Sequence, residues 1–416
     1  MSNHLIKVEI IVNDNELDCH WSPGMEVGAH LISANLAGVK YWSSKVRECL
    51  NQFVSDYKTP EAIDVKQRKG IRLYREHLQL LATAGNALYR ALCDDSKHTT
   101  TPEEMRDWLG ATRRVLADRG DSCFITFMVP DNVHVPWGLI YDADPAKLSM
   151  DDTELPKMEE FEDFWCIKFG ASSVHSTIPL RAIPGTLPGE SFQLLSAINQ
   201  SVYGRAYSVM PDVEQAFVET FWGETNIQGV FSEHQLREAW SQINRENGIL
   251  YFYCHANGTT IELSETEPLS AEELHLVLRR AMRSPSVNLA FFNGCNTAIG
   301  PDKHTGEIGR SFMEIIKALE FRGYIGTEAK IPDVFALRFG FDFLFYFLNG
   351  NGCLLEAMGY LRRKHWPLSL VYTINCDPLV ALSRKGVRAF PDKLSDDNFS
   401  TDRIGSNLLH RNLGLT

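Results

Sequence analysis

A histidine and a cysteine each follow a short apolar segment, and together they could cleave an amide bond. Residues 249–253 (ILYFY) run into Cys254 and His255, and residues 287–292 (VNLAFF) run into Asn293-Gly294-Cys295. A thiol attacks as a thiolate, and a neighbouring imidazole can take its proton and return it to the leaving amine. Taken alone, such a cysteine is more often a buried hydrophobe and such a histidine a hydrogen-bonded loop residue. The pair predicts acyl transfer, with Cys295 as nucleophile and His255 as base.

The elements around these residues should bring them together. A helix predicted at 270–283 joins the two apolar strands, so the three form one βαβ crossover with parallel, neighbouring strands. In an open parallel sheet, reactive side chains gather outside the carboxyl ends of the strands. Cys254 points to the other side of its strand by two-residue alternation, so we expect it in the core.

The rest of the chain from Cys123 onward predicts an α/β fold. Apolar strands are expected at 123–129, 164–170, 249–253, 287–292 and 323–327, and helices at 212–222, 232–245, 270–283, 306–320, 333–348 and 353–364. This alternation is typical of an open, mostly parallel sheet flanked by helices.

The N-terminal region has a different pattern. Residues 4–12 alternate apolar and polar residues and precede a turn at 13–15, which predicts a hairpin. Helices follow near 42–56, 63–94 and 102–118, the last opened by Thr101-Pro102-Glu103-Glu104. A chain of 416 residues is longer than a single hydrophobic core usually supports, so we expect more than one domain. We predict a hairpin plus helical module at 1–118, an α/β domain at 119–383 and a polar tail at 384–416.

Composition excludes several classes of function. The formal net charge is −12 and the 41 basic residues are scattered, so we expect no direct nucleic-acid partner. The longest apolar stretch, 334–348, contains Arg338 and Asp342, and the first residues lack the pattern of a secretory signal. We therefore expect no membrane association and a cytoplasmic location.

Known cofactor and metal motifs are missing from the sequence. The nine cysteines lie far apart without a CxxC pair, which predicts reduced thiols and no metal site. P-loop, GxSxG and HExxH motifs are absent as well. We expect no cofactor.

Several segments in order resemble the CHAT peptidases, which are similar to caspases, separases and gingipains in fold and in their His-then-Cys order. The resemblance spans about residues 120 to 380. It rests on ILYFYCHANG, LSAEEL, NLAFFNGCNTA, RSFMEIIKALEFRGYIGTEAKIPD and the segment 134–142, HVPWGLIYD.

The resemblance implies a caspase-like, regulated intracellular cysteine endopeptidase with His255 and Cys295 as its dyad. Backbone N–H groups of Ala256 and Cys295 would hold the oxyanion. Asp333 or Glu262 would face a basic substrate residue, although Asp333 could instead cap a helix. The substrate would be a protein, such as a gasdermin-like effector in bacterial antiviral defence. A protease in the cytoplasm also needs a restraint, so we expect an activating protein to bind the N-terminal module.

The sequence differs from the family pattern at two places, and two functions other than a peptidase remain open. Many relatives have glycine where this chain has Ala256, so a catalytically silent CHAT module used for protein interaction is the first alternative. An amidase or thioesterase that acts on small molecules is the second. The caspase signature around the cysteine is replaced by Asn293-Gly294-Cys295-Asn296-Thr297, so we do not expect specificity for aspartate.

Overall fold

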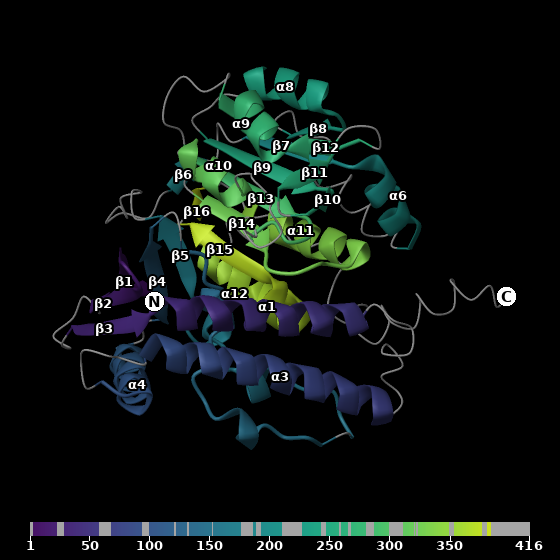
Figure 1. The fold of residues 1–416 in the computed structure, drawn as a ribbon. Coiled ribbons are helices and arrows are strands. Elements are labelled where there is room, and N and C mark those ends of the chain that lie inside the picture. The colour runs from purple at the N-terminus through teal and green to yellow at the C-terminus, as the bar shows by residue number, and fades with distance from the viewer. Residues whose placement is uncertain are drawn as a thin grey trace.

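The computed structural model describes most of the chain (Figure 1). The described residues are 3–22, 29–57, 68–93, 100–119, 122–130, 133–151, 153–175, 186–188, 193–209, 227–242, 247–257, 259–264, 268–279, 287–298, 311–319, 321, 323–348, 353–376 and 381–383. The predicted helix at 212–222 and the predicted tail at 384–416 lie outside them.

An eleven-stranded sheet forms the centre of the fold. Its strands, in spatial order, are β3 (His30–Asn35), β2 (Glu16–Ser22), β1 (Asn3–Asn13), β4 (Ser122–Val129), β5 (Ser172–His175), β15 (Tyr372–Cys376), β14 (Gly323–Thr327), β13 (Val287–Asn293), β9 (Asn247–Tyr253), β7 (Gln193–Ile198) and β8 (Ile227–Val230). Neighbours are parallel except at β1–β2, β2–β3 and β14–β15. The predicted open, mostly parallel sheet is confirmed.

Smaller elements complete the strands. One three-stranded sheet contains β10 (His255–Ala256), β11 (Thr260–Glu262) and β12 (Pro268–Ser270), and β6 (Thr186–Pro188) pairs with β16 (Ala381–Ser383). Short 3₁₀ segments lie at Trp137–Leu139 (η1), Pro145–Lys147 (η2), Met158–Phe161 (η3) and Leu368–Val371 (η5).

Helices cover both faces of the large sheet (Figure 1). They are α1 (Leu36–Tyr57), α3 (Arg68–Cys93), α4 (Pro102–Asp118), α5 (Trp165–Lys168), α6 (Gln200–Val209), α8 (Glu233–Gln242), α9 (Ala271–Arg279), α10 (Phe312–Ala318), α11 (Asp333–Leu348) and α12 (Leu354–Lys364). Helix α4 begins as its sequence predicts, because Thr101 and Glu104 cap each other's backbone N–H groups and Pro102 occupies the first turn.

Two hydrophobic clusters lie on opposite faces of this sheet. The first joins residues of α1, α3, α11 and α12, and the second joins residues of α8, α9 and α10. Strand β1 pairs in parallel with β4, and Trp21 packs edge-on against Phe127 and Trp165. The N-terminal hairpin and helices therefore extend the same sheet and share the first cluster with the α/β region.

One predicted strand is wrong. Residues 164–170 do not form a strand but a turn of helix, α5. Trp165 and Phe169, four residues apart, pack edge-on at 6.0 Å between ring centroids, as one helical turn allows. A short apolar run carries too little periodicity to separate a buried helix from a buried strand.

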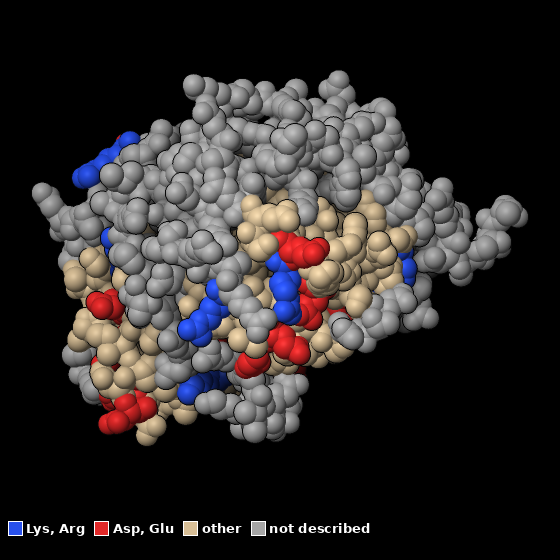
Figure 2. All heavy atoms as spheres, turned by 90° about the horizontal axis from the view of Figure 1, so that it is seen from above, with Lys and Arg blue, Asp and Glu red and all other residues tan. Residues whose placement is uncertain are grey.

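Acidic and basic side chains both occur on the described part of one face. In the view from above, Figure 2 shows several Lys and Arg side chains close to Asp and Glu side chains there. Within the described ranges, no helix is long and apolar enough to cross a membrane. The apolar helix α11 instead buries an ion pair between Arg338 and Asp342, 3.0 Å apart.

Candidate active site

Four parallel strands end at one edge of the sheet and place the candidate residues there. Strands β7, β9, β13 and β14 run in the same direction. Asn293, the last residue of β13, lies opposite Tyr253, the last residue of β9. Cys295 and His255 each follow two residues later, so both residues come directly after the carboxyl ends of two neighbouring strands.

Side-chain contacts place both residues on the face of the sheet that carries the first cluster. Tyr251 and Tyr253 of β9 belong to the first cluster, whereas Cys254 belongs to the second. Cys295 packs against the first cluster, and His255 contacts Arg205, which also contacts Asp333 at the start of α11, a helix of that cluster. The prediction that Cys254 lies in the core is confirmed, and burial raises the pKa of its thiol.

The two strand-end loops touch at Gly294. A Cβ at this position would lie 2.7 Å from the carbonyl oxygen of Cys254 and 3.1 Å from the Cβ of Ala256. Any larger residue would push apart the segments that carry His255 and Cys295. The glycine before Cys295 is therefore required by close approach of two backbones.

The sulfur of Cys295 is half-buried beside the segment that follows β14. Ile331 N–H donates to Sγ at 3.4 Å, and Sγ lies 3.8 Å from the Ile331 carbonyl oxygen. Asn296, with φ of +56°, turns the chain and donates its N–H to Ala329 O at 3.2 Å. Asparagine tolerates this left-handed conformation better than most residues. These contacts fix where the thiol sits.

A buried polar network supports this loop from below. Asn293 Nδ2 donates to Tyr251 Oη at 2.9 Å and to the carbonyl oxygen of Ala336 at 2.6 Å, and its Oδ1 accepts from Tyr372 Oη at 2.6 Å. Strands β9, β13 and β15 and helix α11 are thereby joined just beneath Cys295. These supporting roles could not be predicted from the sequence, in which only Asn293 lies next to the predicted nucleophile.

His255 contacts Arg205, which was not among the site residues predicted from the sequence. Arg205 Nη2, from α6, lies 2.8 Å from His255 Nε2 and 3.2 Å from Asp333 Oδ2. The Arg205 side chain is 55% exposed and that of Asp333 is 31% exposed. Tyr253 Oη donates to the Asp333 carbonyl oxygen at 2.9 Å. The guanidinium of Arg205 thus bridges His255 and Asp333, which lies at the start of α11.

Glu262 reaches the same region through the β10–β11 hairpin. It lies directly opposite His255 in the antiparallel ladder and is exposed. Asn199, which follows β7, donates Nδ2 to the Glu262 carbonyl oxygen at 2.7 Å and its N–H to Tyr253 O at 2.9 Å. The hairpin is therefore held at the end of β9, with both predicted acidic residues near His255.

Ala256 adopts an unstrained backbone conformation. It is extended in β10, and the described non-glycine residues with positive φ are Asp14 and Asn296. Asn257 N–H donates to Thr260 O at 3.1 Å, so by ladder alternation Ala256 and Ile261 form a pair without mutual hydrogen bonds. The Ala256 N–H consequently points away from β11.

A buried ion pair connects helix α1 to the segment around Cys295. Arg47 Nε lies 2.7 Å from Glu328 Oε2, and Arg47 Nη2 donates to the His134 carbonyl oxygen at 3.1 Å. Asn51 Oδ1 accepts from Lys330 N–H at 3.1 Å. Two side chains of α1 thus hold the segment whose backbone contacts Cys295.

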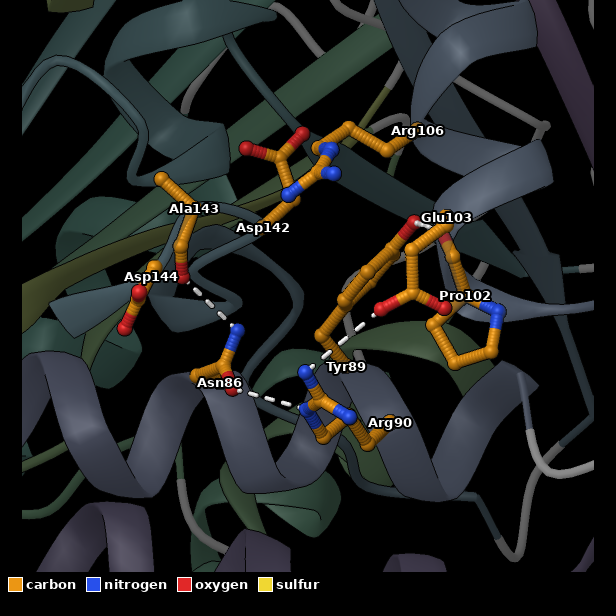
Figure 3. Close-up of a pocket in the computed structure, with 9 residues that line it drawn as sticks. All are labelled: Asn86, Tyr89, Arg90, Pro102, Glu103, Arg106, Asp142, Ala143 and Asp144. Carbon is orange, nitrogen blue, oxygen red and sulfur yellow. Dashed lines mark hydrogen bonds and ion pairs between the residues drawn. The ribbon is translucent and has the colours of Figure 1, made fainter.

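A separate small cavity lies between α3, α4 and the chain after η1 (Figure 3). Its volume is about 30 Å³, enough for about two water molecules. Burial raises the pKa of the Asp142 carboxyl in its wall, although Lys168 lies 2.7 Å away. None of the residues that line this cavity belongs to the candidate site, so we assign the cavity no catalytic role. They are Asn86, Tyr89, Arg90, Pro102, Glu103, Arg106, Asp142, Ala143 and Asp144.

Comparison with solved structures identifies the fold. Two crystal structures of the Saccharomyces cerevisiae separase–securin complex match with TM-scores of 0.54 and 0.50 and identities of 11% and 10%. The chain has the caspase-like fold of separase. In both comparisons the match covers 92% of this chain but only 30% of the separase chain. No family model and no curated protein sequence matches, so membership of the CHAT family stays a prediction.

Proposed function

We propose that this protein is a cysteine endopeptidase in which Cys295 is the nucleophile and His255 the general base. The observation that carries the proposal is the shared position of the two residues. They follow the same ends of adjacent, in-register parallel strands in a separase-like sheet. A thiol and an imidazole in that relation can perform acyl transfer.

The reaction would proceed in two stages. His255 takes the Cys295 proton, the sulfur attacks the scissile carbonyl carbon, and the C–N bond breaks as His255 protonates the leaving amine. Water, deprotonated by His255, then hydrolyses the thioester. The N–H groups of Ala256 and Cys295 would stabilise the oxyanion in both stages. The orientation of the Ala256 N–H away from β11 supports this assignment.

The acidic residues beside His255 favour a basic substrate residue. Asp333 lies within reach of the same guanidinium that contacts His255, and Glu262 lies opposite His255. A carboxylate at this distance from the dyad would pair with a lysine or arginine side chain before the cleaved bond. The substrate would be a specific protein, such as a bacterial defence effector.

Helix α1 is the proposed route of regulation. Its Arg47 and Asn51 hold the segment that contacts Cys295. An activating protein that binds the N-terminal module could shift this segment between a misaligned and an aligned state, provided that it binds the aligned state more tightly. The module would then act as the switch of the peptidase.

A catalytically silent interaction module is the alternative that Ala256 suggested. The extended, unstrained backbone at Ala256 weakens the argument for it. Selective alkylation distinguishes the two functions. A peptidase should show rapid reaction of Cys295 with iodoacetamide that falls in His255→Ala, while the half-buried Cys49 serves as the reference thiol. Because Arg205 contacts His255 Nε2, the comparison is repeated in an Arg205→Ala background, where equal alkylation rates of Cys295 with and without His255 would leave no support for the dyad.

A further inference from the structure

A single nitrogen of Arg205 joins the proposed base to the proposed substrate-binding acid. Nη2 lies 2.8 Å from His255 Nε2 and 3.2 Å from Asp333 Oδ2. A guanidinium can only donate hydrogen bonds, so Nε2 must be the acceptor in this contact. A neutral imidazole has one accepting nitrogen, and the ring proton therefore resides on Nδ1.

This contact is incompatible with His255 acting as a base. The one lone pair that could take the Cys295 proton is engaged by Arg205. A protonated imidazole donates from both nitrogens, so it could not keep the bond to Arg205 either. Arg205 has to leave Nε2 before the proton can be transferred.

The exposure of Arg205 indicates that it can leave at little cost. Its side chain is 55% exposed and that of its partner Asp333 is 31% exposed, and ion pairs of this kind contribute little to stability. A substrate guanidinium or ammonium on Asp333 would take that partner away. It would also bring a second positive charge to within a few ångströms of Arg205, and like charges repel.

We propose that Arg205 is a specificity-determining residue, which occupies His255 until a basic side chain of the substrate binds Asp333. This inference rests on the proposed peptidase function and adds a condition to it. A substrate with an uncharged residue at that position leaves Arg205 on Nε2, and the base stays blocked. Substrates with a basic residue are then preferred for two reasons: they bind Asp333, and they release His255 to act as a base.

Alkylation of Cys295 by iodoacetamide tests the proposal in the full-length chain. Arg205→Ala should react on the order of fivefold faster than wild type, because an exposed pair of this strength no longer holds the base. Agmatine, a small guanidinium compound, should accelerate the reaction in wild type but not in Arg205→Ala. The matched control is Arg237→Ala, which removes an exposed guanidinium paired with Glu233 on α8, on the other face of the sheet.

Two peptides that differ only in arginine or citrulline at the cleaved position provide a second readout. Arg205→Ala should raise cleavage of the citrulline peptide and narrow the preference for arginine. The proposal is overturned if Arg205→Ala reacts no faster than wild type, if agmatine leaves the wild-type rate unchanged, or if the preference stays the same. Equal Cys295 reactivity in Arg205→Ala and in the Arg205→Ala/His255→Ala double variant would instead refute the dyad itself, and the Arg205 proposal with it.

Discussion

Arg47 on α1 forms a 2.7 Å ion pair with Glu328, a carboxylate that is 3% exposed and follows β14. Three residues further on, Ile331 donates its N–H to Cys295 Sγ. This buried pair, together with the hydrogen bond from Lys330 N–H to Asn51 Oδ1, links α1 to the segment that contacts the candidate nucleophile. Deleting residues 1–118 would also remove β1 from β4 and uncover Trp165, so a single substitution tests this link more cleanly.

We expect Arg47→Met to lower turnover and the alkylation rate of Cys295 by about 10- to 100-fold, because a small misplacement of the thiol is costly for catalysis. Arg47→Lys should retain part of the rate. Lys45→Met removes the exposed Lys45–Glu48 pair of the same helix and should change neither rate. Full turnover in Arg47→Met would show that α1 does not position the thiol.

Substitution of the dyad should remove peptidase activity while the fold remains. Cys295→Ala should abolish cleavage, and His255→Ala should lower its rate by about 10² to 10⁴. Both residues are only partly buried, so thermal unfolding should change little. Cys49→Ala, which removes another half-buried thiol, should cleave normally. Substantial cleavage by purified Cys295→Ala would contradict the assignment of the nucleophile.

Gly294→Ala should misplace Cys295. The new Cβ would lie 2.7 Å from the Cys254 carbonyl oxygen, and overpacking of this kind costs about 1–3 kcal/mol. We expect slower alkylation of Cys295 and a lower free energy of unfolding. Gly110→Ala in α4, where a Cβ meets nothing within 4 Å, should instead stabilise the protein by about 0.5–1 kcal/mol. An alanine at 294 with wild-type reactivity would contradict the close approach of the two loops.

The place of Cys295 and His255 in the fold could be predicted because the strands that precede them are local and regular. Strands β9 and β13 are continuous apolar runs, as buried parallel strands are, and a helix joins them. The parallel order then follows from the handedness and length of one crossover. Cys295 and His255 are simply the polar residues that come after those runs.

The surroundings of the dyad were not predictable, since they come from distant parts of the sequence. Arg205 precedes His255 by 50 residues and Arg47 precedes Glu328 by 281. Neither arginine has a periodicity or motif that distinguishes it from a solvated side chain. Strand β15 was not predicted either. It is short, and its partner β14 lies two helices earlier in the sequence and runs antiparallel to it, so no local pattern indicates the pairing.

Cleavage should follow a basic residue. A peptide-library screen should show arginine or lysine at the cleaved position, and Asp333→Asn should lower kcat/KM for an arginine peptide by about tenfold or more, as loss of a charged hydrogen bond implies. Glu262→Gln, on the other side of His255, should have the smaller effect because Glu262 is exposed. Preference for aspartate or for apolar residues would exclude Asp333 as the specificity residue.

The last prediction concerns stability, through the buried ion cluster of α11. Asp342 lies 3.0 Å from Arg338, 2.6 Å from His365 and 3.5 Å from Lys364. Burial alone would raise the pKa of the Asp342 carboxyl, but these cationic or hydrogen-bonding partners outweigh it and lower the pKa from 3.8 to about 2. A carboxyl group whose pKa falls on folding stabilises the folded state at pH values above its ordinary pKa.

Asp342→Asn should therefore lower the free energy of unfolding by about 3–5 kcal/mol at pH 7, because Arg338 loses its buried carboxylate. The Asp342 contribution in wild type is complete above about pH 4 and is lost as the pH falls toward 2, so the difference between the two proteins should shrink over that range. Urea unfolding at several pH values measures it. Glu76→Gln breaks an exposed pair of the same i, i+4 spacing and should cost less than about 1 kcal/mol. If the two substitutions cost the same, or if the Asp342→Asn deficit does not depend on pH, the buried cluster contributes no more than a surface ion pair.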